Sequence, residues 1–353
     1  MKVAAGPAMS TLGRTITTVA KAASNDHAPT ALAAVVQMCS TADVSANLRR
    51  AVKVVQTAAA RGAKTILFPE ATDYVAENAA QARALAQPLT GPFVAALRET
   101  AAKHQVEIVV GVHEKLDDDE VAQFAAKQPD HDAPTFANAL VAIDGGKQDD
   151  AALGRILAVY RKMHLFDVDI PNGPRLHESA TCAAGNRVVD PVPLHIGQLG
   201  LAICYDIRFP ALSAALRTRG ANILTFPSAF TEPTGAAHWS ILNRARAIET
   251  QCYVVSPAQI GRHSSVRSSY GAAMVVDPWG RVLVEGPSFD EWPRFLEQRK
   301  VGAQVPVGEI EVVEADKEGG AAFALFEVDH AVTNKTRQSM PVWAHRREPA
   351  LYE

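Results

Sequence analysis

The sequence feature that most constrains the fold is an alternation of short apolar runs with segments of helical spacing. The apolar runs are rich in Val, Ile and Leu and short enough for buried strands; they occupy 32–39, 64–70, 106–114, 138–144, 155–165, 199–203, 221–230, 252–259 and 321–329. Helical spacing lies at 47–60, 92–103 and 238–251, and a helix is expected after Pro210. Strands alternating with helices predict an α/β layered fold. Later strands follow one another more directly, with a hairpin over 270–286, so part of the sheet structure is expected to be antiparallel or mixed.

The length and composition predict one domain with an N-terminal extension. A chain of 353 residues with 48% hydrophobic content can bury a large core, and no long Pro/Gly/Ser linker divides it. We expect the domain to cover 31–353, with long insertions near 117–134, an acidic surface loop, and near 287–320. Residues 1–30 contain three basic residues and no acid before Asp26. They resemble a mitochondrial presequence, and a flexible tail is the alternative.

Charge and cysteine content exclude several classes of function. The formal net charge is −3 and the chain has no Lys/Arg run, which argues against a nucleic-acid partner. The four cysteines are scattered, and no Cys/His spacing suits zinc. So few cysteines fit a reducing compartment, and we expect the protein to be cytoplasmic or, given the extension, mitochondrial. No apolar run approaches the length that spans a bilayer, so no membrane partner is expected.

The segment GLAICYDIRFP (200–210) predicts a strand, a turn and a helix. Cys204 follows the apolar run, and Pro210 suits the first position of the following helix. The carboxyl end of such a strand is where an open sheet presents reactive groups. A thiol at this position is either a nucleophile or, as free cysteine often is, a small buried hydrophobe.

Two more polar residues end apolar strands, Glu70 and Lys162. Each alone would most often be a solvated charge. Together with Cys204 they match a known chemistry, because a cation lowers the pKa of a thiol and a thiolate is a strong nucleophile. A carboxylate can take the thiol proton and deliver it to a leaving nitrogen. A lysine can stabilise the oxyanion of a tetrahedral intermediate.

These motifs resemble those of the nitrilase, or carbon–nitrogen hydrolase, superfamily. They are LFPE ending at Glu70, YRKMHLFDVDIP around Lys162 and GLAICYDIRFP around Cys204. The resemblance implies that Glu70 is the general base and then acid, that Lys162 stabilises the oxyanion and that Cys204 is the nucleophile. The backbone N–H of Tyr205 would complete the oxyanion hole, and Glu178 would hold the lysine and the attacking water.

The resemblance also implies a fold and an assembly. The fold is a four-layer αββα sandwich, and the protein is a homodimer or a higher homo-oligomer that needs no metal and no organic cofactor. A two-fold contact is expected on the face of the helix after Cys204, which carries the apolar run ALSAAL (211–216).

Further segments resemble the Nit branch of the superfamily; they are FPSAFTEPTGAAHW (226–239), RARAIETQCYVVSPAQIGRH (244–263) and YGAAMVVDPWG (270–280). Within it, Arg262-His263 followed by Ser269-Tyr270-Gly271 is closest to the amidases of deaminated glutathione. The implied reaction splits the amide between a 2-oxoglutaryl group and cysteinylglycine. Two alternatives stay open: an omega-amidase that acts on 2-oxoglutaramate, and a non-catalytic interaction module.

Such a substrate carries a carboxylate at each end, which calls for cationic groups and above all for arginine. The candidate substrate-binding residues are Arg208, Arg262, His263 and Arg267, with Phe230 and Thr231 as pocket wall. Arg208 is alternatively a buried structural arginine paired with Asp206 or Glu70, since buried charges need partners. Arg262 and Arg267 are alternatively exposed loop charges.

Overall fold

The computed structural model describes residues 30–127, 133–146, 153–169, 175–316, 319–347 and 351. The predicted N-terminal extension, apart from Thr30, lies outside the described residues. Among the helices of these ranges, none has the length and apolar content needed to cross a membrane.

The first sheet is built on β1 (Ala31–Met38), the first predicted strand. Its described strands run in the order β13 (Ser268–Tyr270), β12 (Ala258–Arg262), β1, β2 (Thr65–Leu67), β3 (Glu107–Lys115), β4 (Phe136–Asp144) and β5 (Arg155–Arg161). β17 (Gly319–Val328) pairs antiparallel with β1, and β16 (Ile310–Asp316) pairs with β17. β1, β2 and β3 are parallel, and the β3–β4–β5 part is antiparallel.

The second sheet holds the Cys204 strand. Its order is β15 (Val282–Glu285), β14 (Met274–Val276), β11 (Tyr253–Ser256), β10 (Ile223–Thr225), β9 (Gly197–Leu201) and β8 (Val192–Leu194). The three central strands are parallel and the outer pairs are antiparallel, which confirms the mixed pairing expected from the sequence. A separate small pair joins β6 (Asp167–Asp169) to β7 (Arg175–His177).

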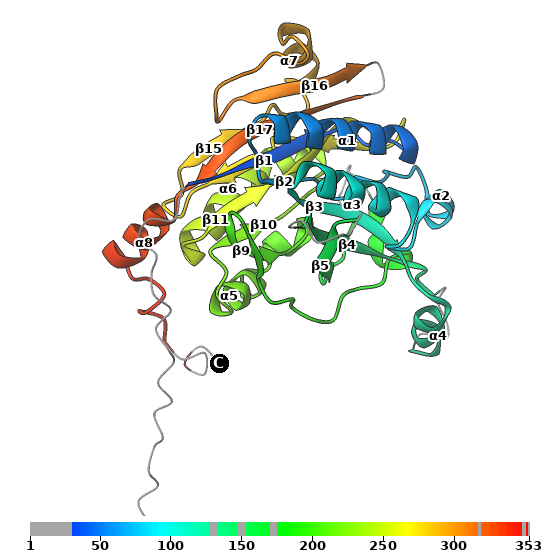
Figure 1. The fold of residues 1–353 in the computed structure, drawn as a ribbon. Coiled ribbons are helices and arrows are strands. Elements are labelled where there is room, and N and C mark those ends of the chain that lie inside the picture. Colours follow the sequence, from blue (N-terminus) through cyan, green and yellow to red (C-terminus); the bar gives the residue numbers. More distant parts are fainter. Residues whose placement is uncertain are drawn as a thin grey trace, which may run out of the picture.

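The two sheets face each other and helices cover their outer faces (Figure 1). Alternate residues of β1 serve two cores: Ala33 and Val35 pack toward the second sheet, while Ala34 and Val36 pack under α1 (Val44–Ala60) and α3 (Pro92–His104). α5 (Pro210–Thr218) and α6 (Glu232–Thr250) cover the second sheet. Strands buried on both faces have continuous apolar sequences, as observed here. The four-layer αββα arrangement predicted from the sequence is therefore confirmed.

Two segments differ from the predictions. The acidic segment 117–134, expected as a loop, contains α4 (Asp118–Lys127), whose first turn is capped by the Asp117 side chain accepting from the Glu120 N–H at 2.8 Å. Acidic residues in a first turn favour a helix, so the charge run nucleates structure here. The run 252–259, expected as one strand, splits at Pro257 into β11 and β12, which belong to different sheets.

The segment 287–320, expected as an insertion, contains regular secondary structure. It forms α7 (Trp292–Gln298) and β16, which extends the first sheet at the far side of β17 (Figure 1). Trp292 is buried in the core between the sheets. The remaining helices are α2 (Ala79–Leu85) and α8 (His330–Ser339), the latter near the C-terminus.

Candidate active site

Cys204 occupies a strained turn at the end of the second sheet's central strands. Its backbone has a φ of +46°, a conformation that residues with a Cβ adopt rarely. The Cys204 N–H donates to the Pro227 carbonyl at 3.0 Å, which ties the turn to the segment after β10. A 3₁₀ turn over Cys204–Arg208 follows, and α5 begins at Pro210 as predicted. Backbone strain of this kind persists only where the surrounding structure holds it.

Asp206 is the group that holds this turn. Its side chain is fully buried and accepts hydrogen bonds from the Ile203 N–H at 2.9 Å, the Tyr160 hydroxyl at 2.7 Å and His164 Nδ1 at 2.7 Å. Arg208 instead lies over the rings of Tyr205 and Phe230 and contacts His238 Nδ1 at 3.2 Å. The alternative of a structural Arg208 paired with Asp206 or Glu70 is therefore wrong.

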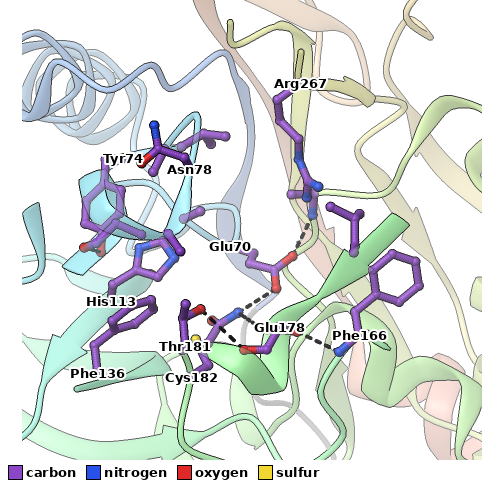
Figure 2. Close-up of a pocket in the computed structure, with 18 of the residues that line it drawn as sticks. Glu70, Tyr74, Asn78, His113, Phe136, Phe166, Glu178, Thr181, Cys182 and Arg267 are labelled. Atoms are coloured by element: carbon purple, nitrogen blue, oxygen red, sulfur yellow. Dashed lines mark hydrogen bonds between the residues drawn. The ribbon is translucent and has the colours of Figure 1, made fainter. Parts of the chain in front are cut away.

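Glu70 and Lys162 meet on the wall of the cavity that Cys204 also lines, and Figure 2 shows Glu70 with Glu178 in this cavity. Lys162 Nζ donates to Glu70 Oε1 at 2.9 Å and to Glu178 Oε2 at 2.8 Å. Asn138 Nδ2 donates to Glu70 Oε1 at 2.7 Å and to Glu178 Oε1 at 2.9 Å, so it bridges the same two carboxylates. The other Glu70 oxygen accepts the Ala229 N–H at 2.8 Å. The structure thus brings together the four side chains that the sequence predicted to act together, Glu70, Lys162, Glu178 and Cys204.

Burial and the neighbouring charges together set the protonation states of Glu70, Lys162 and Cys204. Burial raises the pKa of Glu70, but the Lys162 charge and the hydrogen bonds outweigh it and leave that pKa below its usual range. Burial lowers the pKa of Lys162, yet Glu178 and Glu70 raise it well above its usual range. Burial and then the Glu70 charge raise the pKa of Cys204. Lys162 lowers the thiol pKa as expected, but burial and the Glu70 charge outweigh it, so at rest the thiol is neutral and needs a base.

Backbone packing brings Glu70 to this place. A Cβ at Gly111 of β3 would lie 2.5 Å from the Pro69 carbonyl oxygen, so only glycine lets β3 approach the end of β2 so closely. Asn138 is a site residue that the sequence analysis missed. Its signal is an amide at a buried position of an otherwise apolar strand.

A cavity of about 590 Å³ opens at these groups. The catalytic candidates share its wall with aromatic, polar and cationic side chains, among them Tyr74, His113, Phe136, Phe166, Thr181, Cys182 and Arg267. A much smaller cavity, of about 10 Å³, shares Cys204 with the first and is lined by Tyr205, Arg208, Phe230 and Thr231. Arg267 thus lines the cavity that has room for a substrate, whereas Arg208, Phe230 and Thr231 lie around the small cavity beside the thiol.

Two predicted substrate-binding residues do not line either cavity. His263 is buried, with Nδ1 at 2.7 Å from the Ser40 carbonyl and Nε2 at 2.8 Å from Ser269 Oγ. Burial lowers its pKa to about 4, so it is a neutral structural histidine. Arg262 is exposed at the end of β12. Within the described ranges no group of three His, Cys, Asp or Glu side chains could hold a metal ion.

Comparison with known proteins identifies the family. The family model described as carbon–nitrogen hydrolase matches residues 32–292. This chain belongs to the carbon–nitrogen hydrolase family. The hydrolase is similar to human deaminated glutathione amidase, with 40% identity over 337 residues, 94% of this chain and 87% of that protein.

Solved structures agree with this membership. The hydrolase is similar to the Caenorhabditis elegans NitFhit protein, with 36% identity and a TM-score of 0.70 over 90% of this chain and 65% of that chain. It is also similar to Saccharomyces cerevisiae Nit3, a member of branch 10 of the nitrilase superfamily, with 26% identity and a TM-score of 0.66 over 93% of this chain and 100% of that chain. The resemblance stated from the three motifs is confirmed, and with it the assignment as an enzyme that hydrolyses carbon–nitrogen bonds.

Proposed function

We propose that this hydrolase cleaves deaminated glutathione to 2-oxoglutarate and cysteinylglycine through an acyl thioester on Cys204. The observation that carries the proposal is Lys162 Nζ, held between Glu70 and Glu178 on the wall of the cavity that contains the thiol. The substrate is supported by the name of the human relative and by the cations of the two cavities, since the substrate has a carboxylate at each end.

The first half of the proposed reaction forms the thioester. Glu70, ionised at rest, takes the proton of the neutral Cys204 thiol as Sγ attacks the amide carbon. Lys162 Nζ and the Tyr205 N–H stabilise the oxyanion of the tetrahedral intermediate. Glu70 then gives its proton to the amide nitrogen, the C–N bond breaks and cysteinylglycine leaves.

The second half releases the acyl group. Glu70 takes a proton from water as the water attacks the thioester carbon, and the C–S bond breaks to free 2-oxoglutarate. The proton on Glu70 returns to the Cys204 sulfur, which restores the resting enzyme. Glu178, bonded to Lys162 and to the Phe166 N–H at 2.8 Å, positions the lysine and the water.

A substrate panel tests the proposal. The hydrolase is offered deaminated glutathione, 2-oxoglutaramate, an N-carbamoyl amino acid and a simple nitrile, and kcat/KM is measured for each. We expect the highest value for deaminated glutathione. A higher value for 2-oxoglutaramate would make the protein an omega-amidase. No turnover together with slow alkylation of Cys204 would indicate an interaction module with a vestigial site.

The assembly proposed for this hydrolase is a homodimer formed through α6. The ALSAAL run does not support the contact, because Leu212 and Leu216 are buried in the chain's own core. Ile241 on α6 is 69% exposed, and Ile248 and Trp279 are exposed as well. Light scattering should give a dimer that Ile241→Glu dissociates, whereas a wild-type monomer would reject the idea. The four free cysteines support a reducing compartment such as the cytoplasm.

A further inference from the structure

The cavity wall across from Arg267 carries an imidazole that the proposed reaction does not use. Figure 2 shows His113 between Tyr74 and Phe136, with Glu70 and Glu178 separating this wall from Arg267. His113 lies near the end of β3 and its ring stacks on Tyr74 at 4.2 Å between centroids, with Phe136 edge-on at 5.5 Å. Its side chain is only 14% exposed and lines the cavity. The aromatic packing fixes the plane of the ring.

Asp73 fixes the orientation of that ring. His113 Nδ1 lies 2.9 Å from Asp73 Oδ1, and Asp73 Oδ2 accepts the His113 backbone N–H at 2.8 Å. Oδ1 also accepts the Tyr74 N–H at 2.9 Å. A carboxylate accepts hydrogen bonds, so the proton stays on Nδ1 and Nε2 is the nitrogen left for a ligand. In the part of the chain that the structure describes, Nε2 has no hydrogen-bond partner and is not among the buried unpaired atoms.

The surroundings favour the charged form of this imidazole. Burial lowers the pKa of His113, but Asp73 and the more distant Glu70 and Glu178 outweigh it and raise that pKa. The other titratable groups on this part of the wall are Tyr74 and Cys182, whose pKa values are raised by burial, so both are neutral. In this charged form, His113 presents Nε2 as an N–H donor with a positive charge behind it.

We propose that His113 binds the carboxylate of the 2-oxo-acid half of the substrate and that Asp73 is its positioning residue. The inference rests on the proposed function. The acyl half stays on Cys204 while the amine half departs, so the acyl half needs the enclosed part of the cavity. His113 belongs to that buried wall, whereas Arg267 follows Val266, which is 74% exposed. Arg267 is then left for the glycine carboxylate near the mouth.

Two substitutions of His113 distinguish the contributions of its two ring nitrogens to substrate binding. His113→Asn keeps a donor near the Nδ1 position, toward Asp73, and removes the Nε2 donor. His113→Gln places a neutral donor near the Nε2 position. The substrates are deaminated glutathione and 4-oxopentanoyl-cysteinylglycine, in which a methyl group replaces the acyl-side carboxylate. The matched control is His195→Asn, because His195 also pairs with a carboxylate, Glu107 at 2.7 Å, but lies outside the cavity lining.

We expect His113→Asn to lower kcat/KM for deaminated glutathione by about 10- to 100-fold, mainly through KM, because a charge-assisted hydrogen bond is lost. His113→Gln should lower kcat/KM for this substrate less, because it keeps a neutral donor near the Nε2 position. For the methyl analogue, both variants should stay within about twofold of the wild type, as should His195→Asn for both substrates. An equal loss on both substrates, or no loss on either, would overturn the inference.

Two further measurements keep the test decisive. If His113→Asn does not fold, the wild-type pH profile decides: KM for deaminated glutathione should rise as pH rises through the pKa of His113, while KM for the methyl analogue stays level. If no amide is hydrolysed, the proposed function has failed separately, and calorimetry of 2-oxoglutarate binding to wild type and His113→Gln decides. Equal affinity there, or parallel pH profiles, would reject the carboxylate subsite.

Discussion

The first sheet contributes ionised side chains to the site, and the second sheet contributes the thiol. The first-sheet groups are held by side-chain partners: Lys162 and Asn138 each bridge the carboxylate of Glu70 to that of Glu178, which lies on the 3₁₀ turn after β7. The second-sheet group is held through its backbone, because Cys204 takes its position from a φ of +46° and a hydrogen bond to Pro227. Side-chain changes should therefore have different consequences for stability on the two sides.

The physical reason lies in what each change leaves behind. Removing one partner of a buried ion pair leaves an uncompensated charge, which typically costs about 3–5 kcal/mol. Removing the thiol leaves the turn and its backbone hydrogen bonds in place and creates only a small void. We expect the second sheet to tolerate loss of its reactive group, and the first sheet to lose both activity and stability.

The largest effect on activity is expected from Cys204→Ala. Turnover of deaminated glutathione should fall at least about 10⁴-fold, since groups that act as a unit fail together. The free energy of unfolding should change by less than about 1 kcal/mol, and Cys182→Ala, in the same cavity wall, is the matched control. Activity within tenfold of the wild type would reject Cys204 as the nucleophile. Adding Glu70→Gln to Cys204→Ala should lower activity little further.

The largest effect on stability is expected from Lys162→Met. This change leaves Glu70 and Glu178 facing each other in a buried site, so the free energy of unfolding should fall by about 3–5 kcal/mol, measured by denaturant titration at pH 7. Activity should fall about 10³-fold. Lys53→Met serves as control, because Lys53 pairs with Glu314 on the surface, where ion pairs contribute little. If Lys162→Met and Lys53→Met had the same free energy of unfolding, the stabilising role assigned to the buried ion pairs of the first sheet would be contradicted.

A smaller and more selective effect is expected from Glu178→Gln. The amide keeps the shape but loses the charge that orients Lys162 and the attacking water, so deacylation should slow more than acylation. The variant should accumulate a 2-oxoglutaryl adduct, visible by intact mass and removed by hydroxylamine. Rapid-quench kinetics measures both steps. Should acylation fall as much as deacylation, with no adduct trapped, Glu178 acts in the first step too.

The pH dependence follows from the same charges. The folded-state pKa of Glu70 is lowered from 4.5, so its stabilising contribution is present above pH 4.5 and is lost as pH falls through the lower folded value. The pKa of Lys162 is raised from 10.5, so its contribution is present below pH 10.5 and is lost as pH rises through the higher value. Hence kcat should stay level between about pH 5 and pH 9. A fall of kcat centred between pH 6 and pH 7 would contradict these shifts.

The sequence predicted the convergence of Glu70, Lys162 and Cys204 better than it predicted which side chains line the cavity, for a physical reason. Glu70, Lys162 and Cys204 each follow an apolar strand, and the strand ends of the two facing sheets meet at this site. Arg262 and His263 fit the expected side-chain types and motif, yet Arg262 is exposed and His263 is buried as a neutral group. Which way a loop side chain faces depends on tertiary packing that periodicity does not encode.

Other misses have the same origin. His113 and Asn138 lie in strands that were predicted correctly, but their chemistry depends on Asp73, Glu70 and Glu178, which are remote or on other elements. The break between β11 and β12 depends on which sheet each half joins, and a continuous apolar run cannot show that. The charge run at 117–134 has the composition of a surface loop, and only the capping of α4 by Asp117 distinguishes its first part as a helix.

The smallest effects are expected from the two arginines, which test how far the cation requirement extends beyond the catalytic cluster. Arg267 lines the cavity and Arg262 does not, so Arg267→Gln should lower kcat/KM for deaminated glutathione about three- to tenfold, while Arg262→Gln leaves it unchanged. The loss should be modest because Arg267 is partly exposed and water screens its charge. Replacing the glycine carboxylate of the substrate by a carboxamide should abolish the difference between wild type and Arg267→Gln. A persistent difference would mean that Arg267 shapes the cavity mouth without binding that carboxylate.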